Sequence, residues 1–165
     1  MIVIVMGLPG CGKSFFAQRL SQRLKIKYIG SDQIRKEMKS MGKYSMEEKL
    51  QVYEQMASLA KNAIQQGKSM ILDATFFKEK LRNSFISLAQ SQDVPYGLLW
   101  IEASERIIKE RLSAKREDSE ADYGVYLSLS KQFEEPTLPY LKLESKQDNI
   151  DQMLNQAEDY IHQLT

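Results

Sequence analysis

The stretch Gly7-Leu8-Pro9-Gly10-Cys11-Gly12-Lys13-Ser14 follows directly on the apolar run Ile2-Val3-Ile4-Val5-Met6. It matches G-x-x-x-x-G-K-[ST] and lies between a predicted buried strand and a predicted helix, the context that this motif requires. Glycines in such a loop let backbone N–H groups surround a phosphate, and the helix N-terminus adds its partial positive charge. We expect Lys13 to reach the β- and γ-phosphates of ATP and the Ser14 hydroxyl to bind Mg²⁺. The predicted ATP-binding residues of the loop and the start of the helix are Gly7, Gly10, Cys11, Gly12, Lys13, Ser14 and Phe15.

A glycine-rich loop after a strand has two other interpretations. A dinucleotide-binding fingerprint needs glycine at positions 7, 9 and 12, but position 9 is Pro9 and the third glycine is Gly10, so the spacing is wrong. A glycine-rich turn without any ligand is the other alternative. Cys11 is interpreted as a backbone contributor and not as a nucleophile, and a single cysteine excludes an internal disulfide and a cysteine-based metal site.

On the C-terminal side of the loop, short apolar runs alternate with amphipathic segments. This pattern predicts an α/β fold with a five-stranded parallel sheet flanked by helices. The predicted strands are 2–6, 27–29, 69–72, 96–101 and 140–143. The predicted helices are 16–24, 45–67, 80–90, 150–164 and a pair within 104–133. Ser45 and Glu48 form an S-x-x-E capping box, and Met46, Leu50, Tyr53, Ala57, Ala60 and Ile64 are the expected apolar face of the helix that follows.

Composition limits the classes of protein that need be considered. The chain has 165 residues, which favours a single domain over 1–165, and 42% of them are hydrophobic, which argues against disorder. Lys and Arg number 23 against 22 for Asp and Glu, so any nucleic-acid contact would need a local basic patch. The first apolar run is far shorter than the roughly 20 residues that cross a bilayer. We therefore expect a cytoplasmic protein without a membrane anchor.

Two acidic residues follow predicted strands. Asp73 ends the run Ile71-Leu72-Asp73, where a carboxylate beside the loop would bind Mg²⁺, although such an Asp is often only a turn or cap residue. Asp32 and Arg35 lie at i and i+3 after the second strand, with Ser31 as the expected N-cap. A carboxylate there can take the proton of an acceptor hydroxyl, and the guanidinium can bind an anionic group of that acceptor. The alternative is that Asp32 only stabilises the helix dipole and Arg35 is solvated.

Arginines concentrate in the segment 104–133. Phosphoryl transfer needs cations around the transferring group, and Arg106, Arg111 and Arg116 are candidates to supply one from a helical lid. The alternative is a solvated helix whose arginines pair with Glu105, Glu110 and Glu117.

Together these motifs resemble the P-loop kinase family, in the group that contains polynucleotide 5′-hydroxyl kinases, zeta-toxin-like kinases and predicted small-molecule kinases of the AAA type. The residues that carry the resemblance are Gly7 to Ser14, Ser31 to Arg35, Ile71 to Thr75, Arg82, Glu110 to Arg116 and Phe133 to Pro136. The resemblance implies a P-loop kinase fold with a small helical lid at about 104–133.

The resemblance also implies roles for single residues. Asp32 would be the base toward the acceptor hydroxyl, Arg116 the catalytic lid arginine, and Arg111 would lie nearer the adenine. Arg35, Thr75 and Arg82 would bind the acceptor. The chain departs from the family pattern in two places: Phe15 follows Ser14, where Thr or Ser often contacts the α-phosphate, and Phe76 follows Asp73-Ala74-Thr75, where Asn is frequent.

These observations predict an ATP- and Mg²⁺-dependent phosphotransferase that moves the γ-phosphate to a hydroxyl acceptor. A basic group beside the expected pocket favours a nucleotide, a nucleic-acid 5′-hydroxyl end or a small anionic metabolite: Arg35, Lys36, Lys39, Lys78, Lys80 and Arg82. Phe76 and Phe77 are candidates to stack on a base. The alternatives are a nucleotide-hydrolysing switch or regulatory ATPase, although no N-K-x-D string occurs, and a binding module without catalysis. The oligomeric state is not encoded in any pattern of the sequence.

Overall fold

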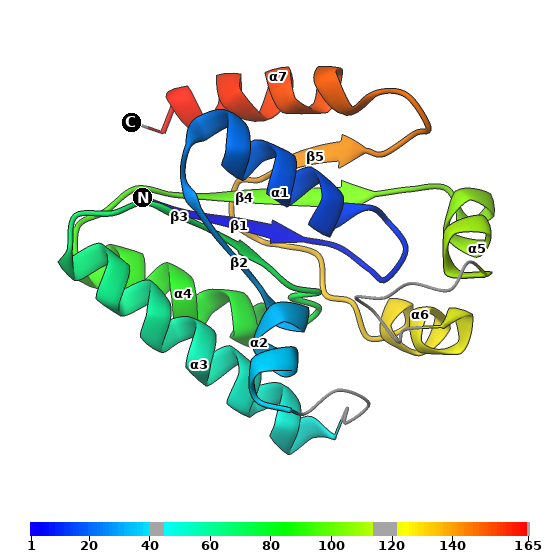
Figure 1. Cartoon of the computed structure of the whole chain (residues 1–165), viewed down its shortest axis with the longest axis horizontal. Coiled ribbons are helices and arrows are strands. Elements are labelled where there is room, and N and C mark those ends of the chain that lie inside the picture. The colour runs from blue at the N-terminus through cyan, green and yellow to red at the C-terminus, as the bar shows by residue number, and fades with distance from the viewer. Residues whose placement is uncertain (40–44, 114–121, 165) are drawn as a thin grey trace.

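A computed structural model describes residues 1–39, 45–113 and 122–164. Its centre is a parallel five-stranded sheet with strand order β2-β3-β1-β4-β5, as the alternating pattern predicts (Figure 1). The strands are β1 (Ile2–Met6), β2 (Lys27–Gly30), β3 (Met70–Asp73), β4 (Tyr96–Glu102) and β5 (Leu141–Glu144). The helices are α1 (Lys13–Leu24), α2 (Ser31–Glu37), α3 (Met46–Gln65), α4 (Glu79–Ser91), α5 (Glu105–Ser113), α6 (Tyr123–Ser130) and α7 (Ile150–His162).

Helices cover both faces of the sheet, and β1 contributes to both cores. Ile2, Ile4 and Met6 pack with residues of α3 and α4, whereas Val3 and Val5 pack with α1 and α7. Figure 1 shows these two layers, with α1 and α7 on one side and α3 and α4 on the other. Burial on both faces explains why β1 is apolar at every position.

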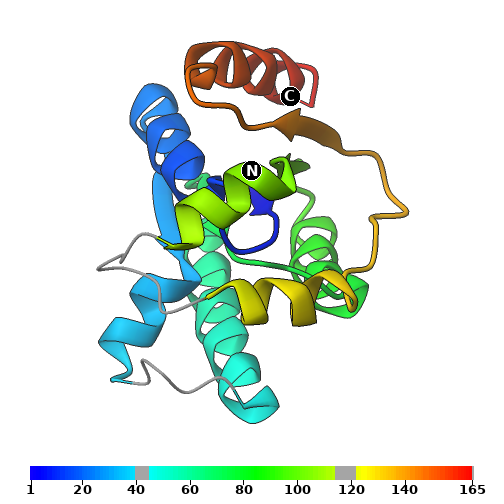
Figure 2. The same ribbon diagram turned by 90° about the vertical axis from the view of Figure 1, so that its right-hand side faces the viewer.

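Strand register brings the functional segments to one edge of the sheet. Asp73 pairs in register with Val5 of β1 and with Gly30 of β2. The loop after β1, the start of α2 and the end of β3 therefore meet at the carboxyl ends of the strands, where ligands bind in open α/β sheets. Figure 2 views this edge and shows the loop after β1 lying between α5 and α6.

The caps and apolar positions predicted from sequence match the observed helices except at the starts of α2 and α3. The capping box of α3 forms, because the Glu48 N–H donates to Ser45 Oγ and the Ser45 N–H donates to Glu48 Oε2, each at 3.2 Å. The apolar face of α3 was predicted too far toward its start, since Met46 and Leu50 are exposed. The expected Ser31 N-cap is also wrong: Gly30 is the N-cap, because β2 runs into α2 without an intervening loop.

No helix in the ranges that the structure describes has the length and apolar character needed to cross a membrane.

Candidate active site

The loop between β1 and α1 has the backbone of a phosphate cradle. Gly10 and Gly12 have φ angles of +83° and +91°, in the left-handed region that favours glycine. A Cβ on Gly12 would lie 2.9 Å from Arg111 Nη1, so a side chain there would displace the Arg111 guanidinium as well as strain the backbone. No side chain caps α1 at Gly12, which leaves the N–H groups of its first turn available to an anion.

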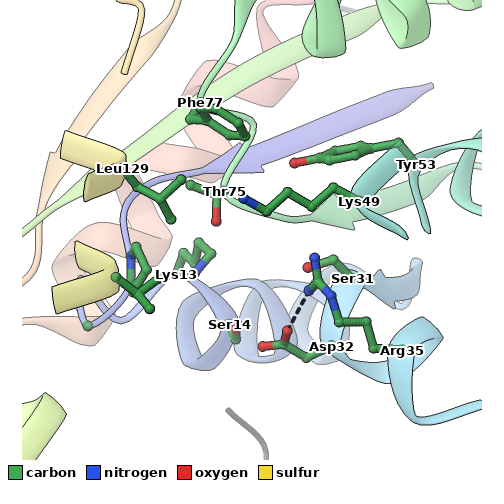
Figure 3. Close-up of a pocket in the computed structure, with 13 residues that line it drawn as sticks. Lys13, Ser14, Ser31, Asp32, Arg35, Lys49, Tyr53, Thr75, Phe77 and Leu129 are labelled. Atoms are coloured by element: carbon green, nitrogen blue, oxygen red, sulfur yellow. Dashed lines mark hydrogen bonds and ion pairs between the residues drawn. The ribbon is translucent and has the colours of Figure 1, made fainter. Parts of the chain in front are cut away.

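Two hollows meet at this loop. We name the first the inner cavity; it is lined by Pro9, Gly10, Lys13, Ser14, Ser31, Asp32, Arg35, Lys49, Tyr53, Thr75, Phe77, Val125 and Leu129 (Figure 3). The second, the outer groove, is lined by Gly10, Gly12, Lys13, Ser14, Phe15, Phe16, Gln18, Asp32, Arg111, Ser145, Lys146, Gln147, Asp148, Asn149, Ile150 and Met153. Gly10, Lys13, Ser14 and Asp32 line both, so the two hollows share one junction.

Asp73 is a buried carboxylate beside this junction. It is 3% exposed; the Tyr28 hydroxyl donates to its Oδ2 at 2.8 Å, and its Oδ1 has no hydrogen bond. Burial raises the pKa of the Asp73 carboxyl, and the Lys13 charge and the nearby Ser14 hydroxyl oppose that rise. An unpartnered carboxylate oxygen next to a hydroxyl and a lysine fits a site for Mg²⁺, which takes one or two carboxylates plus phosphate oxygens.

Asp32 and Arg35 form the predicted i, i+3 pair on α2. Arg35 Nη1 donates to Asp32 Oδ1 at 2.9 Å, and both side chains line the inner cavity with Lys13 and Ser14. The Arg35 side chain is 10% exposed and that of Asp32 35%, so Arg35 is not a solvated surface charge. Thr75, at the end of the β3 segment, lines the same cavity.

Arg111 braces the loop from α5. Its Nη1 donates to Cys11 O at 3.0 Å and to Ser145 Oγ at 3.1 Å, and its Nη2 donates to Lys146 O at 3.3 Å. Ile108 and Leu112 of the same helix lie close to the Cα of Gly10. Arg111 was expected to lie near the adenine. In the structure it links the loop to Ser145 and Lys146, which line the outer groove.

The other residues predicted for the nucleotide lie in different settings. Arg106 is exposed and pairs with Glu110 at 2.9 Å, as the solvated-helix alternative requires. Arg116 lies outside the described residues. Phe15 is 56% exposed at the outer groove, with Arg19 over its ring at 5.3 Å. Cys11 is buried, which raises the pKa of its thiol and agrees with a role through its backbone.

Arg82 was expected to bind the acceptor, but it is buried away from the inner cavity. Its side chain is 1% exposed, does not line the inner cavity, and donates from Nη1 to Phe76 O at 2.7 Å. Tyr53 supports the other side of the same residue, because its hydroxyl accepts the Phe76 N–H at 3.1 Å. Phe76 has a φ of +48°, a strained value for a residue with a side chain. Arg82 and Tyr53 thus hold a strained turn that presents Thr75 and Phe77 to the cavity.

Of the two phenylalanines expected to stack on a base, only Phe77 lies at the inner cavity. Phe76 is fully buried and packs against Tyr53 and Phe85 with ring centroids at 5.3 and 5.5 Å, so it belongs to the core. Phe77 lines the inner cavity. Because the backbone of Phe76 is left-handed, the Phe76 ring lies in the core whereas the Phe77 ring lies at the inner cavity.

Sequence motifs missed several residues of the site. Lys49 and Tyr53 reach the inner cavity from α3, and Tyr28 reaches Asp73 from β2. Tyr53 was assigned to the apolar face of its helix, and Lys49 lies one turn before it, so the i, i+4 spacing was the signal that could have found Lys49. Tyr28 had no signal, because only strand register brings it to Asp73.

Comparisons with known proteins agree with this geometry. A family model described as an AAA domain matches residues 2–136. L-seryl-tRNA(Sec) kinase from Methanococcus maripaludis is 28% identical over 116 residues, which are 67% of this chain and 44% of that protein. The chain thus spans less than half the length of this curated relative.

Solved structures share the architecture. The APS kinase CysC of Mycobacterium tuberculosis, in complex with AMPPNP and APS, has a TM-score of 0.75 at 17% identity, with 98% of this chain and 96% of that one covered. A sugar kinase from Janibacter sp. has a TM-score of 0.77 at 20% identity, with 98% and 94% covered. Identities this low show a common fold. The chain belongs to the AAA-domain family whose model matches most of its length, and it has the fold of the P-loop kinases.

Proposed function

We propose that the protein is an ATP- and Mg²⁺-dependent kinase that transfers the γ-phosphate of ATP to a hydroxyl group of an acceptor. The observation that carries the proposal is the junction of the two hollows, where Asp32 lies with Lys13 and Ser14. A nucleotide in the outer groove would direct its terminal phosphate toward this junction. An acceptor in the inner cavity would approach the same point from the other side.

The residues present fit the nucleotide and the metal. The backbone of Gly10 to Ser14 would hold the phosphates, and Ser14 and Asp73 would hold Mg²⁺, whose charge would neutralise that of the phosphates. Lys13 would bind the β- and γ-phosphates. The orphaned Oδ1 of Asp73 and the uncapped start of α1 support this assignment.

Asp32 would act as the base. Its carboxylate would accept the proton of the acceptor hydroxyl as the oxygen attacks the γ-phosphorus, and the bond from that phosphorus to ADP would break. The ion pair with Arg35 holds the carboxylate toward the cavity. Segment 104–133, which contains α5 and α6 and also Arg116, is our proposed lid, within one kinase domain over 1–165.

The acceptor would be anionic, which includes a nucleotide, a nucleic-acid 5′-hydroxyl end and a small metabolite. Arg35 in the inner cavity supports an anion there. A relative named for L-seryl-tRNA(Sec), and a structural neighbour bound to APS, are consistent with acceptors that carry nucleotide chemistry.

Incubation with γ-labelled ATP and Mg²⁺ tests the function, with separate pools of oligonucleotides, nucleotides, nucleosides and sugar acids. Transfer of the label to a member of one pool supports the kinase and identifies the acceptor. Release of labelled inorganic phosphate at the same rate with and without every pool supports the hydrolytic switch instead. A protein that binds Mg·ATP and never turns it over would be a binding module.

A further inference from the structure

Lys49 lines the inner cavity but belongs to none of the motifs. It extends from the first turns of α3, is half-buried, and holds its Nζ 5.4 Å from the centroid of the Phe77 ring. Within the described part of the chain no carboxylate forms an ion pair with its ammonium group. Loss of solvent and the charge of Arg35 lower the pKa of Lys49. An anion beside Lys49 would offset the repulsion between its ammonium group and Arg35.

Arg35 approaches the same space from α2. Figure 3 shows the Lys49 and Arg35 side chains extending into the cavity from different helices. Among the described residues that line the cavity the cations are Lys13, Arg35 and Lys49, and the one carboxylate is Asp32. Lys13 is assigned to ATP and Asp32 balances one further charge. A positive charge is left on the acceptor side of the cavity.

Apolar side chains contribute part of the wall around this charge. Phe77 is 2% exposed and lies under Lys49, while Val125 and Leu129 reach the cavity from α6. A flat ring gains by burying its faces against these side chains.

Given the kinase function proposed above, we infer that Lys49 and Arg35 jointly bind an anionic group of the acceptor, while Phe77, Val125 and Leu129 contact a flat apolar part of the same molecule. Lys49 is thereby a specificity-determining residue. The acceptor class is an organic phosphate or carboxylate with a ring system, as in a nucleotide.

Equilibrium binding of phenyl phosphate tests this inference without any turnover. Calorimetric titrations are made on the full chain with Mg·AMPPNP at saturation, which occupies the phosphate loop. Phenyl phosphate carries both the anion and the ring, inorganic phosphate carries the anion alone, and phenol carries the ring alone. We expect phenyl phosphate to bind more tightly than either part.

Variants of two lysines on α3 separate the specific role of Lys49 from a general effect of charge. Lys49→Ala should weaken phenyl phosphate about tenfold or more, the scale of a hydrogen bond to a charged group. Lys61→Ala removes an exposed lysine of the same helix and should leave binding within about twofold, the scale of a surface substitution. Lys49→Arg should retain most of the affinity. Unchanged affinity for Mg·AMPPNP shows that the Lys49 variants are folded, and Lys49→Gln replaces Lys49→Ala if the latter unfolds.

Two results overturn the inference: phenyl phosphate that does not bind the wild type, or equal affinities in Lys49→Ala and Lys61→Ala. Both leave the kinase proposal standing, since that proposal fails only when labelled ATP gives no transfer to any pool.

Discussion

At the scale of single residues, burial of the Asp73 carboxylate should lower the stability of the ligand-free protein, and the same carboxylate is the proposed ligand of Mg²⁺. Its burial raises its pKa, so the folded state binds this proton more tightly than the unfolded state does. The free energy of unfolding therefore falls as the pH rises from the usual aspartate pKa through the raised one. Above that range Asp73→Asn should increase the Tm of the ligand-free protein and abolish Mg²⁺-dependent nucleotide binding. Calorimetry with and without Mg·ATP measures both effects.

Asp151→Asn is the matched control for that prediction, because Asp151 is exposed on α7. It should leave nucleotide binding unchanged and should not raise the Tm, because Asp151 lies in the first turn of α7, where its charge favours the helix dipole. A Tm that decreases in Asp73→Asn, with Mg·ATP binding retained, would contradict the assignment of Asp73 to the metal.

Asp32 should separate catalysis from nucleotide binding. Asp32→Asn keeps the size of the side chain but removes the base, so label transfer should fall about 100-fold or more, whereas the Kd for Mg·ATP should change little. Single-turnover rates and fluorescence titration measure the two quantities. If both fall together, Asp32 belongs to the nucleotide site.

At the scale of elements, the capping box stabilises the first turn of α3. Ser45 and Glu48 satisfy backbone donors of the turn that carries Lys49. Ser45→Ala should lower the free energy of unfolding by about 1 kcal/mol, measured by urea denaturation. Ser84→Ala, inside the exposed face of α4, should have little effect because that hydroxyl only bonds to a carbonyl of its own helix. Equal losses in the two variants would exclude a capping role.

The turn between β3 and α4 depends on a hydrogen bond to the Tyr53 hydroxyl, and its loss should affect both stability and acceptor binding. Tyr53→Phe leaves the buried N–H of Phe76 without its acceptor, which costs about 1–3 kcal/mol in the free energy of unfolding. Because this turn presents Thr75 and Phe77, the KM for the acceptor should rise more than that for ATP. Urea denaturation and steady-state kinetics check the two parts. Tyr126→Phe is the control, since the Tyr126 hydroxyl has no hydrogen bond within the described residues, and an equal loss there would contradict the role of Tyr53.

At the scale of the whole molecule, ligand binding should couple to global unfolding. The phosphate loop joins β1 at the centre of the sheet to α1, so occupation of the loop stabilises elements of both cores. Mg·ATP at 100 times its Kd should add about 2.7 kcal/mol to the free energy of unfolding. Lys13→Ala should remove most of this gain, as measured by Tm against ligand concentration. A Tm of the wild type that does not respond to Mg·ATP would refute the site.

Much of this architecture could be predicted from sequence because its signals are local. Apolar runs identified the strands, and the capping box of α3 was predicted residue for residue. The pair of Asp32 and Arg35 followed from helical spacing alone. Arg82 was assigned to the acceptor from the family resemblance and from its place in a basic group, whereas its side chain is buried, and that burial depends on how α4 packs on the sheet.

The α/β class, the phosphate loop and the carboxylates at the ends of two strands can be predicted from sequence, since each depends on neighbours within one turn or one strand. Which of these side chains share a cavity depends on how the helices and strands pack. Tyr28 meets Asp73 through strand register, and Lys49 meets Arg35 through the packing of α3 beside α2. Such contacts join residues far apart in the chain, and their geometry is fixed by the burial of whole faces and not by any local pattern.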